Sequence, residues 1–167
     1  MKVSVKVKGM EELVRNLSVL QVSAKVRVAE AVRETSKELR KEARTRVPRK
    51  SGAFAKRIRT KFSKDQLTAR TAAFARSGRP HPLSHIIEFG TKPHSLAPKA
   101  KRALTIGDGF AASAQHPGTA AKPWLFPSFE AVKPKYVSLL EKALNLAGED
   151  AASGRAPNDQ TVTEDGS

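Results

Sequence analysis

The most informative part of this sequence is a stretch of twelve residues, His116-Pro117-Gly118-Thr119-Ala120-Ala121-Lys122-Pro123-Trp124-Leu125-Phe126-Pro127. A second stretch precedes it, Ile86-Ile87-Glu88-Phe89-Gly90-Thr91. Each combines apolar residues with a Gly-Thr pair, and glycine is typical of a turn. Prolines on both sides of the only tryptophan restrict the backbone where the bulkiest side chain sits. Neither stretch carries a catalytic pattern, so both specify shape and contact.

Length and charge indicate one domain with a tail. A chain of 167 residues is the size of a single domain. Its net charge of +15 is unevenly distributed, because residues 1–61 carry +12, residues 62–147 carry +7 and residues 148–167 carry −4. We therefore predict one α+β domain over residues 1–147 and an acidic, apolar-poor tail over residues 148–167 that is flexible.

Several classes of protein are disfavoured by what the sequence lacks. It has no cysteine, so a disulfide framework and a thiolate metal site are both excluded. The N-terminus alternates lysine and valine instead of showing the apolar core of a signal peptide, and no apolar run approaches the length of a membrane span. We expect a protein that is not exported through a cleaved signal and has no membrane partner.

The N-terminal third predicts a strand and a long helix. Valines alternate with polar residues over residues 3–7, which is typical of a strand with one buried face. From Met10 the apolar residues recur at helical spacing until Pro48, with a blurred stripe at residues 21–23 that leaves a kink or short break open. The opposite face of this helix is rich in arginine and lysine with interleaved glutamates.

The remaining elements are predicted from turns and alternation. After a turn at residues 48–52 we expect a hairpin (58–62 with 67–72), a strand or short helix (84–89), an extended arm (91–100), a second hairpin around a three-residue loop (101–106 with 110–114), and a C-terminal helix (128–146) that Pro134 kinks or restarts and Gly148 stops. The fold class is therefore α+β: a mostly antiparallel β-sheet with a long N-terminal amphipathic helix and a C-terminal helix packed on one face.

Catalytic and metal sites have little support. His81, His85 and Glu88 could share a helical face, with His94 and His116 joining them in space, but Pro80 and Pro82 disfavour a helix at His81. A hydrogen bond or a subunit-interface ion pair explains Glu88 as well. No nucleophile motif, phosphate-binding loop or dinucleotide fingerprint occurs. We predict no enzymatic activity, no cofactor and no metal.

A basic stretch is the strongest competing signal. Residues 37–61 contain eleven Lys/Arg and two Glu, and clustered cations are sufficient for phosphate contacts. The alternative is a solvated helix face followed by a basic turn. Only Phe54 and Phe62 interrupt the stretch, which argues against stacking on single-stranded nucleic acid. The residues predicted to contact DNA or an acidic partner are Arg40, Arg44, Arg46, Arg49 and Lys50.

The apolar cluster around Trp124 leaves two roles open. Trp124, Leu125, Phe126 and Phe129 form the densest apolar group in the sequence. An aromatic residue is as easily core as interface. The prolines around it favour an extended segment that presents side chains on alternate sides, so one face can pack inward while the other meets a neighbour.

The order of these motifs resembles a known family. Pro48-x-x-Ser51-Gly52 is followed by Ile87-Glu88-Phe89-Gly90-Thr91, Lys92-Pro93-His94, a Pro-Lys-Ala-Lys-Arg-Ala-Leu run at 98–104, and His116-Pro117-Gly118-Thr119 with Lys122-Pro123-Trp124-Leu125. Over residues 2–146 this is similar to the neck and tail-completion proteins, also called minor tail components, of long-tailed bacteriophages and prophages. Phenylalanine is commoner than tryptophan at position 124 in that family, and arginine is common at position 126.

The resemblance implies a structural virion protein of the head–tail interface, assembled in the host cytoplasm and located in the neck or tail. Its partners would be further copies of itself in a ring, connector or portal-stack proteins, tail tube or terminator proteins, and genomic double-stranded DNA through non-specific contact. The predicted interface residues are Glu88, Phe89, Gly90, Thr91, His94, His116, Pro117, Gly118, Trp124, Leu125 and Phe126. The alternative is a small basic nucleic-acid-binding protein that works alone.

Overall fold

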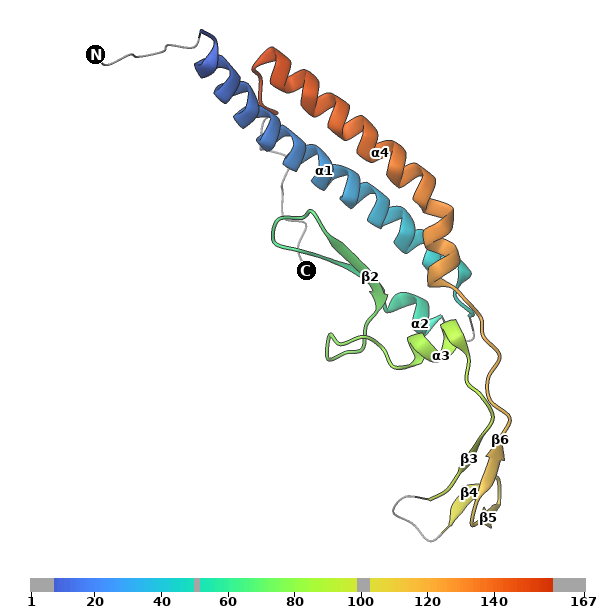
Figure 1. The fold of residues 1–167 in the computed structure, drawn as a ribbon. Helices are drawn as coiled ribbons and strands as arrows, with labels where there is room; N and C mark the ends of the chain where they lie inside the picture. Colours follow the sequence, from blue (N-terminus) through green and yellow to red (C-terminus); the bar gives the residue numbers. More distant parts are fainter. Residues whose placement is uncertain (1–7, 50–51, 99–102, 158–167) are drawn as a thin grey trace, which may run out of the picture. The chain divides into compact units, whose positions relative to one another are not determined.

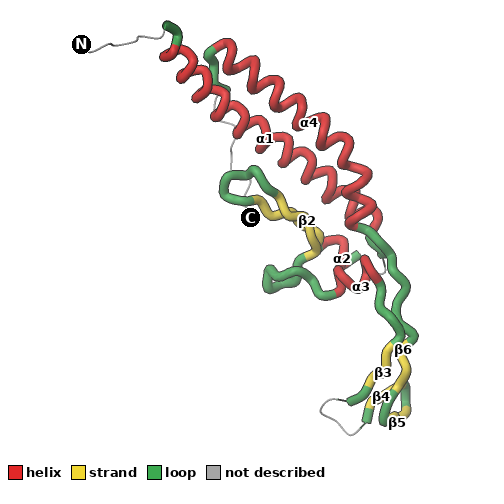
Figure 2. The backbone as a smooth tube through the Cα atoms, viewed as in Figure 1, coloured by secondary structure: helices red, strands yellow, loops and turns green. Residues whose placement is uncertain are grey.

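The computed structural model describes residues 8–49, 52–98 and 103–157. The strand predicted at residues 3–7 lies outside them, as do Lys50 and residues 158–167 of the acidic segment. The elements, in chain order, are α1 (Met10–Arg46), α2 (Ala53–Lys56), β1 (Ile58–Phe62), β2 (Ala69–Ala73), α3 (Leu83–Phe89), β3 (His94–Leu96), β4 (Leu104–Ile106), β5 (Gly109–Ala111), β6 (Ala114–His116) and α4 (Leu125–Ser153) (Figures 1 and 2).

The predicted α+β class is confirmed. A long N-terminal helix, a C-terminal helix packed against it and small antiparallel sheets make up the described chain. Within the described residues the β structure consists of three two-stranded pairs, β1–β2, β3–β6 and β4–β5, with strands of three to five residues. The segment at residues 84–89, for which strand and helix were both open, is the helix α3.

The chain divides into two compact units. Unit 1 comprises residues 1–39, 60–70 and 131–167, and unit 2 comprises residues 40–59 and 71–130. The two long helices therefore each contribute residues to both units.

Unit 1 is a pair of helices with the tip of the first hairpin. Its parts of α1 and α4 lie side by side (Figure 1), and small residues such as Ala31 and Ala147 are buried there. The Lys135 ammonium lies 2.6 Å from a Glu38 carboxylate oxygen and 3.0 Å from one of Glu34, and it joins the two helices. The two acids raise the pKa of Lys135, chiefly through these hydrogen bonds.

One alternative left open for the helices is resolved, and one expectation was wrong. The break considered at residues 21–23 is absent, and α4 continues past Gly148 to Ser153. Ser23 is fully buried and donates its hydroxyl hydrogen bond to Asp150, which also pairs with Arg27 at 2.7 Å. The Ser23 hydroxyl and then the Arg27 guanidinium lower the pKa of Asp150. The contact with α1 thus supports the helical turns after Gly148, and Gly154, with φ of +67°, follows the last helical residue.

The predicted apolar stripe of α1 is buried only in part. Leu13 and Leu17 are each 54% exposed, whereas Val32 and Ala43 are buried. Burial of α1 begins at Ser23, where the paired residue Asp150 lies near the end of α4.

Unit 2 has its own small core. Ala43, Val47, Ile58, Ala73 and Trp124 are buried together, and Phe54, Ala55, Ile87 and Leu125 pack around them. Three of the five buried residues are Ala or Val, so the tryptophan is the largest side chain of this core.

Unit 2 also carries an extended double hairpin, here called the arm (residues 91–98 and 103–119). Its strands β3 and β6 pair in the register His94↔His116 and Leu96↔Ala114. Beyond them β4 and β5 pair as Ile106↔Gly109, so the turn is the two residues Gly107 and Asp108 rather than the three that we expected. The extended conformation predicted after Thr91 is confirmed over β3 (Figure 2).

Candidate functional site: the Gly-Thr crossing and the Glu88 cap

The two Gly-Thr pairs of the sequence meet at the base of the arm. Thr91 donates its backbone N–H to the Thr119 carbonyl at 2.9 Å, and Thr119 donates to the Thr91 carbonyl at 3.1 Å. Gly90 and Gly118 have φ of +71° and +86°. A Cβ on Gly90 would lie 2.4 Å from the Thr119 carbonyl oxygen, and one on Gly118 would lie 2.3 Å from that of Thr91. Each glycine therefore permits close approach of the other motif, and we call this arrangement the Gly-Thr crossing.

Gly90→Ala is expected to open this crossing. The added methyl group would overlap backbone atoms, which cannot rotate away, in a conformation with φ of +71° and ψ of −170° that is essentially restricted to glycine. The matched control is Gly52→Ala, because Gly52 also has φ of +71° but has no atom within 4 Å of the added methyl. Chemical denaturation should show a loss of about 1–2 kcal/mol for the control and a clearly larger loss for Gly90→Ala. Equal losses would show that the close approach has no energetic weight.

Glu88 caps the N-terminus of α4. Its carboxylate is 8% exposed and accepts three backbone hydrogen bonds, from the N–H groups of Trp124 (2.8 Å), Leu125 (2.9 Å) and Phe126 (3.0 Å). The first N–H groups of a helix have no partner within the helix, and a negative charge there is also favoured by the helix dipole. The Lys122 N–H adds a fourth bond, to the Ile87 carbonyl at 2.8 Å. Glu88 thus holds the end of α3 against the start of α4.

Trp124 lies in the core of unit 2. Its side chain is 1% exposed and meets the Phe54 ring edge to face, with ring centroids 5.7 Å apart at an interplanar angle of 89°. Of the two roles that the sequence left open, the structure displays the core role. Its indole nitrogen has no hydrogen-bond partner within the described residues.

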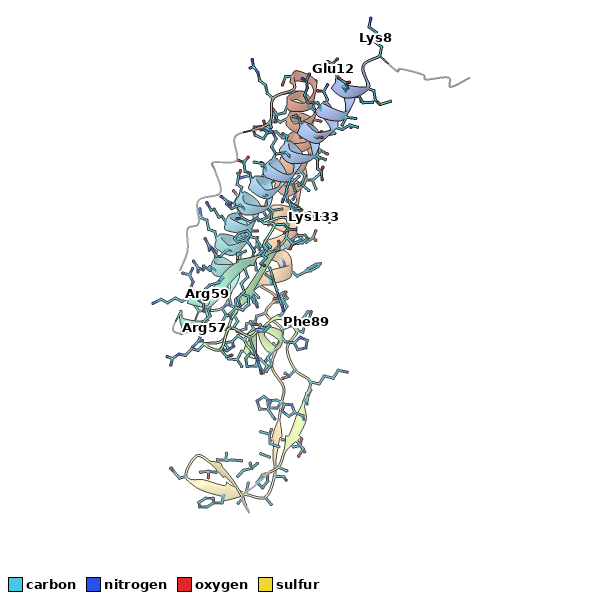
Figure 3. The ribbon with its side chains drawn as sticks, turned by 90° about the vertical axis from the view of Figure 1, so that its left-hand side faces the viewer. Lys8, Glu12, Arg57, Arg59, Phe89 and Lys133 are labelled. Carbon is cyan, nitrogen blue, oxygen red and sulfur yellow. The ribbon has the colours of Figure 1, made fainter. Side chains whose placement is uncertain are left out.

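The predicted interface residues therefore separate into two groups. Glu88, Gly90, Gly118 and Trp124 are occupied in building the junction between α3, the arm and α4. Others remain on the surface: Phe89 and Phe126 are 68% and 66% exposed, and Leu125 is half-buried on the core. Figure 3 shows Phe89 beside the start of the arm.

Two of the four histidines, His94 and His116, lie in the arm. The rings of His94 and His116 stack with centroids 5.0 Å apart, as their paired positions in β3 and β6 require. The His116 ring also accepts a hydrogen bond from the Gly118 N–H at 3.0 Å, which spans Pro117 and stabilises the turn into the crossing. His81 packs edge to face on Phe54. Within residues 8–49, 52–98 and 103–157, no group of three metal-ligating side chains is gathered.

The predicted basic residues have different environments. Arg44 donates to the Ile58 carbonyl through two guanidinium nitrogens at 2.8 and 3.2 Å, and Arg49 donates to the Arg44 carbonyl at 3.3 Å. Arg46 pairs with Glu42 at 2.8 Å, and Arg40 is half-buried. Lys50 is not among the described residues.

Two features were missed by reasoning from the sequence. One is Lys56, which lines a surface hollow together with Arg44 and Arg49. The other is the set of exposed apolar side chains on the arm, where Leu96, Ile106 and Phe110 are 40%, 51% and 78% exposed. Alternation in the short strands around the Gly107 turn was a signal for the second feature, whereas only the fold brings Lys56 beside Arg44.

Part of the chain is similar to a known protein family. Residues 11–90 match the model of a family described as "Bacteriophage HK97-gp10, putative tail-component". Neither the curated proteins nor the solved structures gave a match. Among the described residues, no helix is long and apolar enough to span a membrane. The matched region runs from α1 through α3 and ends at Gly90, the first glycine of the crossing. Over residues 11–90, a little under half of its length, this chain is similar to the HK97-gp10-like family of phage tail components, and this similarity supports a structural role in a phage tail.

Proposed function

We propose that this protein acts at the head–tail interface, in neck assembly, tail completion or head–tail joining, by oligomeric contact. The observation that carries the proposal is the exposure of apolar side chains along the arm, namely Leu96, Ile106 and Phe110. The register of β4 and β5 places Ile106 and Phe110 on opposite faces of the hairpin. Isolated two-stranded hairpins are marginally stable in water, and exposed apolar side chains on them favour burial against another protein. We propose that neighbouring copies of this chain bury these side chains on both faces of the arm.

A ring assembled from identical subunits places one surface of each subunit against a different surface of the next. The arm is the first of these surfaces, and the exposed side chains of Phe89 and Phe126 are the candidates for the second. Connector or portal-stack proteins and tail tube or terminator proteins would then bind the faces of the ring.

The test compares two pairs of substitutions. Ile106→Gln with Phe110→Gln removes apolar groups from the arm, and Val137→Gln with Leu144→Gln removes them from α4, where both residues are also exposed (46% and 56%). Light scattering and negative-stain microscopy, with and without tail tubes, should show rings for the parent and the α4 pair. The arm pair should be monomeric with its melting temperature unchanged. Rings formed equally well by the arm pair would refute the proposal.

We further propose that genomic double-stranded DNA contacts unit 2 without sequence preference. Unit 2 contains sixteen Lys/Arg and four Asp/Glu, so it carries +12 of the net charge of +15. Such a surface attracts a polyanion through release of counterions. If the parent protein is strictly monomeric, leaves tail tubes unbound and binds duplex DNA in a salt-sensitive manner, the alternative of a nucleic-acid-binding protein working alone replaces the neck role.

A further inference from the structure

We propose that a surface hollow of unit 2 binds a backbone phosphate of duplex DNA. Arg44, Arg49, Gly52, Ala55 and Lys56 line this hollow, which has a volume of about 390 Å³. We call it the basic hollow. Three of these five residues are cations and none is an acid. The inference rests on the proposed contact with DNA and is independent of the proposed ring.

The two arginines of the basic hollow are held by carbonyl groups. Arg44 is fixed by the Ile58 carbonyl, and Arg49 by the Arg44 carbonyl. A carbonyl orients a guanidinium without neutralising its charge. Elsewhere in the described chain Arg27 and Arg46 are paired with the carboxylates of Asp150 and Glu42. The basic hollow thus keeps its positive charge, whereas the charges of Arg27 and Arg46 are neutralised by carboxylates.

The shape of the basic hollow leaves room for an anion. Gly52 presents no side chain, and the space where its Cβ would stand contains no atom within 4 Å. Ala55 adds only a methyl group to the lining. An arginine presents several N–H donors in a planar fork that matches the oxygens of a phosphate group. Guanidinium and ammonium groups around an open recess are therefore suited to a tetrahedral oxyanion.

The surroundings favour duplex DNA as the source of the phosphate. From Ala43 to Arg59, within unit 2, the sequence has seven Lys/Arg and no Asp/Glu. Arg57 follows Lys56 directly and Arg59 comes two residues later, and in the view of Figure 3 both lie to the left of unit 2 while Phe89 lies to the right. A run of cations without acids suits a ligand with regularly repeated negative charge, and duplex DNA carries about one charge per 1.7 Å of its axis. An acidic protein surface rarely reaches that density.

The experiment measures how duplex binding depends on salt. Arg49→Gln with Lys56→Gln removes two cations from the basic hollow but keeps Arg44, which also supports the backbone. Lys142→Gln with Arg155→Gln removes the same charge from exposed positions of unit 1. Fluorescence anisotropy with a labelled duplex of random sequence gives the slope of log K against log salt concentration. Each lost phosphate contact reduces this slope by about 0.9.

We expect a reduction of about 0.9 for the hollow pair, because its two cations hold one phosphate, together with an affinity about eightfold weaker at 0.1 M salt and an unchanged melting temperature. The control pair should change the slope by less than half as much. Equal effects of both pairs would overturn the proposal, because net charge alone would then explain binding. Inorganic phosphate that raises the melting temperature of the parent but not of the hollow pair, with duplex binding unaffected, would also overturn it in favour of a free anion. A parent protein that forms no rings, with the slope difference between the two pairs intact, would count against the proposed ring only.

Discussion

Trp124→Ala lowers the free energy of unfolding by about 3–5 kcal/mol, if the core of unit 2 behaves like other cores that lose a large aromatic side chain. Trp124 is the only large ring among the five fully packed residues, and its neighbours Ala43 and Ala73 are too short to fill the space it would leave. The edge-to-face contact with Phe54 would be lost as well. Urea unfolding followed by circular dichroism measures the effect, since the variant has no tryptophan fluorescence.

Trp124→Phe is the matched control. It retains an aromatic ring against Phe54 and removes an indole N–H that has no hydrogen-bond partner in the described structure. Trp124→Phe should therefore lower the free energy of unfolding by less than half as much as Trp124→Ala does. An alanine variant as stable as the parent would mean that this core does not support the fold.

Glu88→Ala should cost roughly 3 kcal/mol or more, because hydrogen bonds to a charged group contribute about 1.5–3 kcal/mol each and buried donors left without a partner are costly. Three N–H groups at the start of α4 would lose their acceptor together. Glu88→Gln should fall between the parent and the alanine variant, since the amide retains one acceptor oxygen but directs an NH₂ group at one of the three donors. Thermal unfolding and urea unfolding both measure the loss.

The control for Glu88 is Glu141→Ala, an exposed glutamate on the same helix. A surface substitution of this kind usually changes stability by less than about 0.5 kcal/mol. If Glu88→Ala and Glu141→Ala were equally mild, the three hydrogen bonds to Glu88 would be incidental to the fold.

The sequence predicted the elements whose signals are local. The stripe of α1 through Val32 and Ala43 and the hairpin after Ile58 follow from the spacing of apolar residues. The interpretation of Glu88 as a hydrogen-bonding residue is confirmed, but its partners were not foreseen. They are backbone N–H groups 36 to 38 residues later in the chain. Backbone donors are present at nearly every residue, so no side-chain pattern marks them.

The end of α4 was predicted wrongly, because a local signal was overridden. Gly148 is a reasonable helix stop by local preference. The structure continues the helix because Asp150 finds Ser23 and Arg27 on α1, residues more than 120 positions earlier. Tertiary pairing of this kind overrides local preference. The assignment of residues 1–147 to one domain and of the following residues to a flexible tail stays a prediction.

The Gly-Thr crossing makes the arm an independent insertion. The chain leaves the body of unit 2 at Thr91 and returns at Thr119, and the two threonines are bonded to each other. The residues of the arm between Thr91 and Thr119 therefore do not set the positions at which α3 ends and α4 begins. Arms of different length or composition can be exchanged at this point between otherwise similar proteins, so evolution can alter what the arm contacts while the tryptophan core and the Glu88 cap are retained.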